Sequence, residues 1–543
     1  MAPTSVSPPP PLTEEPELLG TLREDLLAAD YTNAGVAQLL GEEAVSALDR
    51  EQVVPGQLRV TEALAEHRPG TAEHACAVLA AFWLLAVEVT AAQLDAALPR
   101  LGVHGLKRLR LVQVGDEDEA LAAPTCDLRP YQVQQRHELS QQPREADLWV
   151  ASDLSAHQVQ GALPHDHVLG VGQASLTLAG ITHRRRVGTA LDIGTGCGIH
   201  VLHLLDHAER VVATDISARA LDFTRFNLLL NAETLRLDPR RLSDRVELLH
   251  GSLLEPVAGR TFDLVVSNPP FVITPRRDGE TDAERYTYRD AGRRGDSLMD
   301  ELITSLPAVL NPSGTVQMLG NWEIEEGTDW SARPRTWVEQ ASSSAPVEAW
   351  FIQRDQQTPA QYAETWLRDA SEERDIPGYR SRYHQYLQDF ESRRIAGIGF
   401  GMIWLRRPAL TDTGEPLRRF EEITSEVQQP LGPIIGQTVE RCLAVAQDLE
   451  AELEQTLSVA PDVTEERYQR FGAPHPEVIL ARQGAGLRRA RPISSAAAGF
   501  LSAADGEFTA SQLITAVTAL TETDEAALRA EVVDLYTDGF LHP

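Results

Sequence analysis

The spacing of apolar side chains changes twice along the chain. From about Glu17 to Arg144, apolar residues recur every three or four positions, as in LREDLLAADY and VTAAQLDAALPRLG, which predicts amphipathic helices, the second capped by Thr90. From Asp147 onward, short apolar runs such as DLWVASDL, TALDIG, RVVATDI and FDLVVSNPP alternate with helical stretches, which is typical of βαβ units. After about Ala409 the pattern becomes helical again.

This pattern predicts four segments. Residues 1–16 form a disordered leader whose four prolines, Pro8 to Pro11, keep it extended, and residues 17–146 form an α-rich N-terminal domain. Residues 147–409 form an α/β domain with a mostly parallel sheet, which includes TVQMLG, EAWFIQRD and a last strand at AGIGFGMIWLRRP. Residues 410–543 form a helical, winged-helix-like C-terminal domain.

The charge balance and the lengths of the apolar runs argue against free DNA and a membrane as partners. The net charge of -31 opposes sequence-independent attraction to phosphate backbones, so free DNA is a poor partner. From Thr411 to Pro543 there are 22 acidic and 10 basic side chains, which favours protein docking or packing over DNA binding by that domain. The apolar run from Ala75 to Val87 is shorter than the roughly 20 residues that a membrane-spanning helix needs, so we expect a buried core helix and no membrane anchor.

The cysteines do not form a metal-binding or disulfide pattern. They lie far apart in sequence and lack the short spacings of Cys and His ligands, at Cys76, Cys126, Cys197 and Cys442. We therefore expect no metal site and a reducing, cytoplasmic location.

A glycine-rich loop marks the first candidate binding site. The segment LDIGTGCG, from Leu191 to Gly198, follows an apolar strand and precedes a helical stretch, so its glycines permit a tight turn and expose backbone N–H groups to a ligand. The next strand ends in Asp215, whose carboxylate can accept hydrogen bonds from ribose hydroxyls. A dinucleotide site would favour a small residue in place of Ile199, which makes a dehydrogenase the weaker interpretation.

The second motif is a strand that ends in Asn268-Pro269-Pro270-Phe271. The tandem proline stops the strand and removes two backbone donors, which leaves the carbonyls before and between the rings as free acceptors. The Asn268 side-chain oxygen and the Pro269 carbonyl can then bind the two N–H groups of an amide or an exocyclic amine, and favour charge that develops on its nitrogen. Phe271 can stack on the planar group that bears this nitrogen.

Together these motifs resemble the class I S-adenosylmethionine methyltransferases, and within them the small-methyltransferase-domain group with an NPPF motif. This group includes release-factor glutamine methyltransferases and rRNA guanine methyltransferases. The likeness is detailed over roughly His165 to Ile273 and weaker to about Ala409. It implies a Rossmann-like fold and S-adenosylmethionine as the cofactor.

The resemblance also implies roles for individual residues. Asp192 and the loop residues would hold the methionine end of the cofactor, Asp215 its ribose and Ile216 its adenine; the loop residues are Gly194, Thr195, Gly196 and Gly198. Many relatives carry an acidic residue at the position of Ser252, so the contact with the adenine amino group is expected to be weaker or to come from the Leu253 backbone. The stretch from Val168 to Leu178 resembles the segment that covers the cofactor.

The acceptor stays open at this stage. A protein glutamine amide and a nucleobase amine present the same planar geometry, so the substrate is a protein similar to a release factor or an RNA. A regulatory protein that binds the cofactor and a small-molecule methyltransferase are the alternatives. The arginines and acids that alternate after Phe271, from Arg276 to Asp296, form either a substrate loop or a solvated, self-paired loop.

Overall fold

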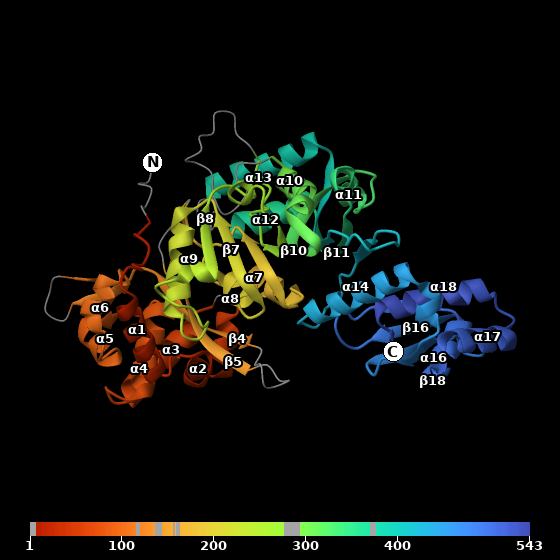
Figure 1. Cartoon of the computed structure of the whole chain (residues 1–543). Coiled ribbons are helices and arrows are strands. Elements are labelled where there is room, and N and C mark those ends of the chain that lie inside the picture. Colours follow the sequence, from red (N-terminus) through yellow and green to blue (C-terminus); the bar gives the residue numbers. More distant parts are fainter. Residues whose placement is uncertain are drawn as a thin grey trace.

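In the computed structural model, the described residues are 7–50, 52–115, 120–135, 144–155, 158, 163–164, 166–275, 294–369 and 376–543. Figure 1 shows a mainly helical N-terminal unit, a central sheet covered by helices, and a C-terminal unit that joins the centre through α14 (Gly432–Gln447). None of the described helices is long and apolar enough to span a membrane.

The N-terminal unit packs helices around the apolar run identified in the sequence. That run forms the end of α4 and a π-helical turn, η1 (Ala80–Leu84), whose side chains are all buried, so the expected core helix is confirmed. Thr90 caps α5 in a capping box with Gln93, as expected. The elements are α1 (Pro16–Ala28), α2 (Asn33–Leu48), α3 (Val54–Glu66), α4 (Ala72–Leu79), α5 (Ala91–Ala97), α6 (Gly102–Arg108), β1 (Val89–Thr90), β2 (Val112–Val114) and β3 (Leu121–Pro124).

Residues 7–15 lie against the molecule. The Leu12 N–H donates to the Leu109 carbonyl at 3.0 Å, the Pro8 carbonyl accepts a hydrogen bond from Arg219, and Pro11 is buried. The prediction of a disordered leader is therefore wrong for this part of residues 1–16, because these contacts hold the proline run in place.

In the part of the chain that the structure describes, the central sheet has eight strands in the order β13-β11-β12-β10-β9-β6-β7-β8. From β6 the chain builds outward to β7 and β8 on one side and to β9 and β10 on the other, all in parallel, whereas β12 runs antiparallel between β10 and β11. The strands are β6 (Val187–Ile193), β7 (Ala208–Asp215), β8 (Val246–His250), β9 (Phe262–Ser267), β10 (Leu310–Glu325), β11 (Glu348–Gln357), β12 (Ile395–Arg406) and β13 (Arg418–Glu422). In this doubly wound, Rossmann-like order the direction of winding reverses between β6 and β9, and sheets of this kind generally bind ligands at the carboxyl ends of the strands at that point.

Helices cover both faces of this sheet. Leu264 and Val266 of β9 pack into one apolar cluster and Val265 packs into another, as in strands that are buried on both faces. The helices are α7 (Gln173–Ile181), α8 (Ile199–Leu204), α9 (Ala218–Leu230), α10 (Ser297–Ser305), α11 (Ala332–Ser344), α12 (Pro359–Asp369) and α13 (Ile376–Ser392).

Two strands differ from the sequence prediction. The expected strand at DLWVASDL is β5 (Arg144–Ser152), but it lies in a separate antiparallel sheet, where its partner among the strands that the structure describes is β4 (Asp127–Gln135). Conversely, β13 lies beyond the predicted end of the α/β domain at Ala409 and pairs with β11 at the edge of the central sheet. β5 pairs with the strand that precedes it in sequence, whereas β13 pairs with β11 residues 69 positions away. Local periodicity indicates that a strand forms but not which strand it pairs with.

The C-terminal unit combines helices with small sheets, so the prediction of a helical segment was incomplete. β14 lies between β18 and β19 although it precedes both in sequence. The last three helices of the chain and this small sheet are compatible with a winged-helix-like unit. This assignment stays a hypothesis. The elements after α14 are α15 (Leu449–Leu453), β14 (Thr456–Val459), β15 (Val463–Tyr468), β16 (Val478–Gln483), β17 (Ala490–Ile493), α16 (Ser495–Ala503), β18 (Asp505–Thr509), α17 (Ala510–Thr521), α18 (Glu525–Asp538) and β19 (Leu541–His542).

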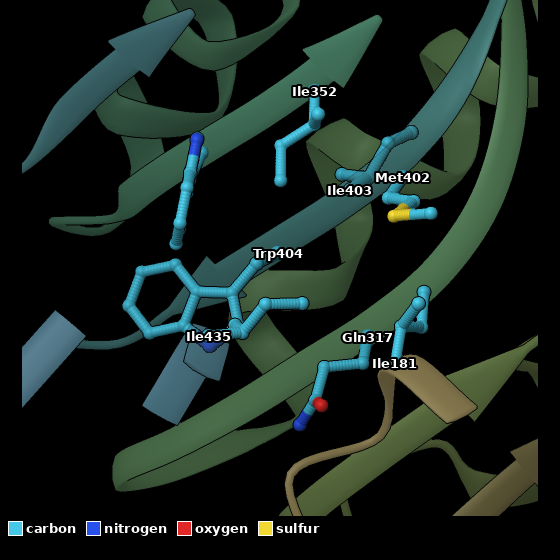
Figure 2. Close-up of a pocket in the computed structure, with 8 residues that line it drawn as sticks. Ile181, Gln317, Ile352, Met402, Ile403, Trp404 and Ile435 are labelled. Carbon is cyan, nitrogen blue, oxygen red and sulfur yellow. The ribbon is translucent and has the colours of Figure 1, made fainter. Parts of the chain in front are cut away.

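The C-terminal unit attaches closely to the sheet. A Cβ atom at Gly432 of α14 would lie 2.2 Å from the Thr182 carbonyl oxygen, so glycine permits the close approach. Figure 2 shows Ile435 of α14 beside Trp404 of β12, and Ile181 of α7 next to Gln317 of β10. These residues line a cavity of about 10 Å³. A cavity of this size holds about one water molecule, so the contact between α14, α7 and the sheet offers no room for a cofactor.

Buried charges reinforce this attachment. Asp538 at the end of α18 is buried and forms ion pairs with Arg419 of β13, with Arg489, and with Arg491 at 2.7 Å. The guanidinium groups of Arg419 and Arg489 also lie 5.0 and 5.7 Å from the ring centre of Trp350 in β11. The C-terminal unit is therefore tied to the sheet edge by polar as well as apolar contacts.

Candidate active site

The glycine loop lies at the carboxyl end of β6. Gly194, Gly196 and Gly198 have φ angles of 72°, 56° and 84°, a region that other residues rarely adopt. The N–H groups of Gly194 and Thr195 donate to the Thr214 carbonyl at 2.9 and 3.0 Å, so the loop turns across the end of β7 before α8 begins. The strand, turn and helix expected from the sequence are therefore all present.

Asp215 lies at the end of β7, in contact with this loop. Its Oδ2 accepts a hydrogen bond from the Gly196 N–H at 2.9 Å, and its Oδ1 accepts one from the Ser217 N–H at 2.8 Å. Burial raises the pKa of Asp215, and these two backbone donors oppose the rise. Each carboxylate oxygen keeps a further lone pair, so the expected bonds to ribose hydroxyls are chemically available and stay a prediction.

Asp192, the penultimate residue of β6, is fully buried. Burial raises its pKa to about 7, while the nearby Thr195 hydroxyl opposes the rise. None of the described residues donates a hydrogen bond of ordinary geometry to either carboxylate oxygen. A buried, unpaired carboxylate is costly unless a cation or a proton joins it, so this site fits the α-ammonium group of a methionine moiety.

The adenine-binding residues expected from the sequence lie at the ends of β7 and β8. The Ile216 side chain is 49% exposed, unusual for a large apolar residue and suited to contact a planar ring. His250 Nε2 lies 2.9 Å from the Ile216 carbonyl oxygen and links the two strand ends. Ser252 follows, and Leu253 has a positive φ of 47°, with its carbonyl 3.4 Å from the Thr214 hydroxyl.

The NPPF turn lies beside the glycine loop. Ser267, the last residue of β9, pairs with Ile193 of β6 and donates its hydroxyl to the Ile193 carbonyl at 2.9 Å, which places the half-buried Asn268 next to Gly194. The Phe271 N–H donates to the Pro269 carbonyl at 2.8 Å. The expectation that this carbonyl is free is therefore wrong, because the chain closes a three-residue turn around Pro270. One lone pair of the carbonyl oxygen is left for a substrate.

Two buried polar residues behind the turn were not found from the sequence. Asn321 of β10 donates through Nδ2 to the Phe271 carbonyl at 2.9 Å and to the Tyr362 hydroxyl at 3.3 Å. The Tyr362 hydroxyl also accepts the Ile273 N–H at 2.7 Å. Asn321 and Tyr362 therefore hold both ends of the backbone after the prolines. Little in the sequence pointed to this role, because β10 carries other polar residues as well, such as Gln317 and Glu323.

The segment expected to cover the cofactor is anchored at one end. The Val168 N–H donates to Asp153 Oδ2 at 2.8 Å, and the Val168 carbonyl accepts the Asp153 N–H at 3.1 Å. Arg219 of α9 holds the same carboxylate in an ion pair. The next residue, Leu169, is 51% exposed and begins the span that leads into α7.

Other candidates contribute less to this site. Arg276 to Arg293 and His165 lie outside the described residues. His200 of α8 is buried, and burial lowers its pKa to about 4, so it is neutral at physiological pH. Within the described ranges, no group of three His, Cys, Asp or Glu side chains is placed to hold a metal ion.

Comparison with known proteins identifies the segment that carries this geometry. Residues 169–284 match the family described as methyltransferase small domain, and residues 28–123 match a domain of unknown function, DUF7059. A release factor glutamine methyltransferase from Aquifex aeolicus is 34% identical over 119 residues, which cover 21% of this chain and 38% of that protein.

Two further relatives act on ribosomal targets according to their names. A ribosomal protein uL3 glutamine methyltransferase from Neisseria gonorrhoeae is 28% identical over 171 residues, covering 29% of this chain and 52% of that protein. Ribosomal RNA small subunit methyltransferase C from Alcanivorax borkumensis is 30% identical over 174 residues, covering 32% of this chain and 44% of that protein. The chain thus spans about half or less of the length of these relatives. Residues 169–284 are therefore similar to a methyltransferase small domain, and they lie within a central α/β unit whose sheet has a Rossmann-like strand order.

Proposed function

We propose that this chain is an S-adenosylmethionine-dependent N-methyltransferase that acts on a planar conjugated nitrogen of a macromolecule, either a protein glutamine amide or a nucleobase amine. The observation that carries the proposal is the bond between Ser267 and Ile193, because it holds the NPPF turn next to the glycine loop. The proposed binding sites for the methyl donor and the methyl acceptor therefore lie side by side, at the ends of β6 and β9.

The candidate cofactor-binding residues follow one another along the sheet edge in the same order as the parts of the cofactor that they would bind. Asp192 and the loop glycines would hold its methionine end, Asp215 its ribose, and Ile216 with Leu253 its adenine. When bound, S-adenosylmethionine supplies a methyl group on a positively charged sulfur. The protein contributes a fixed site for it and no metal is required by this arrangement of residues.

The NPPF turn would bind the acceptor nitrogen. The Asn268 side-chain oxygen and the second lone pair of the Pro269 carbonyl accept its N–H groups, which orients the nitrogen and stabilises positive charge as it develops. Phe271 packs on the flat group that bears the nitrogen and excludes water. The names of the relatives support both classes of acceptor, protein glutamine and ribosomal RNA.

The test is methyl transfer from labelled S-adenosylmethionine into a cell extract that is then separated into protein, RNA and small molecules. Label in protein or RNA supports the proposal and selects the acceptor. Label in small molecules alone, or cofactor binding without any transfer, would overturn the macromolecular methyltransferase and favour a small-molecule enzyme or a regulator, respectively.

A further inference from the structure

A stripe of polar side chains is buried on one face of α9, between the glycine loop and β5. Thr224 and Asn227 of α9 are fully buried, as is Asn231, the C-cap residue that follows Leu230. Threonine and asparagine are unfavourable in helix interiors unless their side chains find partners. Their spacing of three and four residues places all three on the same side of the helix.

Two of these residues complete the outer edge of β5. Asn231 accepts the Trp149 N–H at 2.9 Å and donates to the Trp149 carbonyl at 2.7 Å, while Asn227 accepts the Ala151 N–H at 2.7 Å and donates to the Ala151 carbonyl at 2.9 Å. Four residues of a helix rise about 6 Å and two residues of a strand about 6.6 Å, so successive asparagines match alternate strand residues. The side chains take the place of a neighbouring strand.

The same face of α9 binds the glycine loop. The second N–H of the Asn227 amide donates to the Cys197 carbonyl at 2.8 Å, and the Thr224 hydroxyl donates to the Gly196 carbonyl at 2.9 Å. In a trans peptide the carbonyl and the N–H point in opposite directions, so the bond to Gly196 turns the Cys197 N–H away from α9. The hydrogen bonds from α9 therefore hold the conformation of the glycine loop, on the side opposite to the Cys197 N–H.

We propose that Asn227 is a positioning residue that couples the glycine loop to the β4–β5 sheet. Its two donors bind the loop and the strand at once, so a shift of either partner leaves a buried N–H unpaired, which costs more than a hydrogen bond normally contributes. This inference rests on the proposed function, since it takes S-adenosylmethionine as the occupant of the loop. Because coupling is reciprocal, the cofactor also stabilises β5.

Asn231 provides a matched control, because it is equally buried and binds β5 without contacting the loop. Isothermal titration of the full chain with S-adenosylmethionine would compare the wild type with Asn227→Ala and Asn231→Ala. We expect about tenfold weaker binding for Asn227→Ala and a change within about twofold for Asn231→Ala. Equal affinities for the wild type and Asn227→Ala, or equal losses in both variants, would overturn the proposal.

Thr224→Val tests the loop contact without touching β5, in case Asn227→Ala does not fold. The isosteric change removes the bond to Gly196, and we expect affinity to fall about threefold or more. Unchanged affinity in this variant would count against positioning by α9.

Hydrogen exchange tests the other half of the coupling. Saturating S-adenosylmethionine should slow exchange in peptides from β5 of the wild type but not of Asn227→Ala. If the rate of exchange in β5 of the wild type is the same with and without the cofactor, the coupling is overturned. Absence of any cofactor binding by the wild type would instead overturn the proposed function, so the two failures are distinguishable.

Discussion

Asp192 is expected to destabilise the cofactor-free protein. Burial raises its pKa to about 7 from an ordinary 3.8. Between these values the unfolded chain ionises while the folded protein keeps the proton, so the free energy of unfolding falls as pH rises and stays low above pH 7. The difference amounts to about 4 kcal/mol at pH 8, since one pKa unit corresponds to about 1.4 kcal/mol.

Asp192→Asn removes the ionisation and keeps the shape of the side chain. We expect the variant to be more stable than the wild type at pH 8, and its advantage to grow by about 2.5 kcal/mol between pH 5 and pH 8. The free energy of unfolding would be measured in urea, with hydrogen exchange in peptides from β6 as the signal. This signal reports on the unit that contains the substitution. An advantage that is independent of pH, or a variant that is less stable at pH 8, would refute the reasoning.

The same ionisation is expected to govern cofactor affinity. If the Asp192 carboxylate meets the cofactor's ammonium group, binding releases a proton below pH 7, and affinity falls by up to about tenfold per pH unit below that value. Titration of the wild type with S-adenosylmethionine at pH 6 and pH 8 measures this dependence. Asp192→Asn should bind weakly at both values, and a strong, pH-independent affinity of the variant would remove Asp192 from the site.

Three other substitutions test the surrounding structure. Asn321→Ala leaves the Phe271 carbonyl without its donor and should lower stability by about 1–3 kcal/mol in urea unfolding; an unchanged midpoint would contradict its role behind the turn. Gly198→Ala places a Cβ 2.8 Å from the Thr224 Cγ2 atom at a φ of 84°, so S-adenosylmethionine affinity should fall at least about tenfold, whereas Gly20→Ala, with open space around it, should bind normally. Burial raises the pKa of Asp538, but Arg419 and Arg489 lower it further, below its ordinary value; its ion pairs therefore stabilise above about pH 4 and weaken as pH falls. Asp538→Asn should accordingly lower the melting temperature at pH 7 more than at pH 3, and equal losses would argue against these pairs.

The sequence predicted the parts of the site that depend on local chemistry. Glycines at Gly194, Gly196 and Gly198 indicated a turn that needs positive φ angles, and the tandem proline indicated where β9 stops. Both signals lie within a few adjacent residues, and the carboxyl ends of parallel strands necessarily share one edge of a sheet. Their arrangement side by side therefore followed from the predicted fold.

The parts that depend on distant pairing were missed. Asn227 and Asn231 bind strand residues 76 and 82 positions away, and β13 pairs with residues of β11 that lie 69 positions earlier. A buried asparagine within a helix looks like a local irregularity until its partners are known. Likewise β14 pairs with β18 and β19, whose residues lie 47 to 84 positions later in the chain, so its short apolar run carried little signal by itself.

Asn268 tests the central claim most directly. Methyl transfer from labelled S-adenosylmethionine to the responsive fraction of the extract would be measured for the wild type and Asn268→Ala, together with the cofactor affinity of each. Transfer should fall by a factor of about a hundred or more in the variant, with cofactor affinity unchanged. Equal transfer by the two proteins at equal cofactor affinity would contradict the proposed role of Asn268.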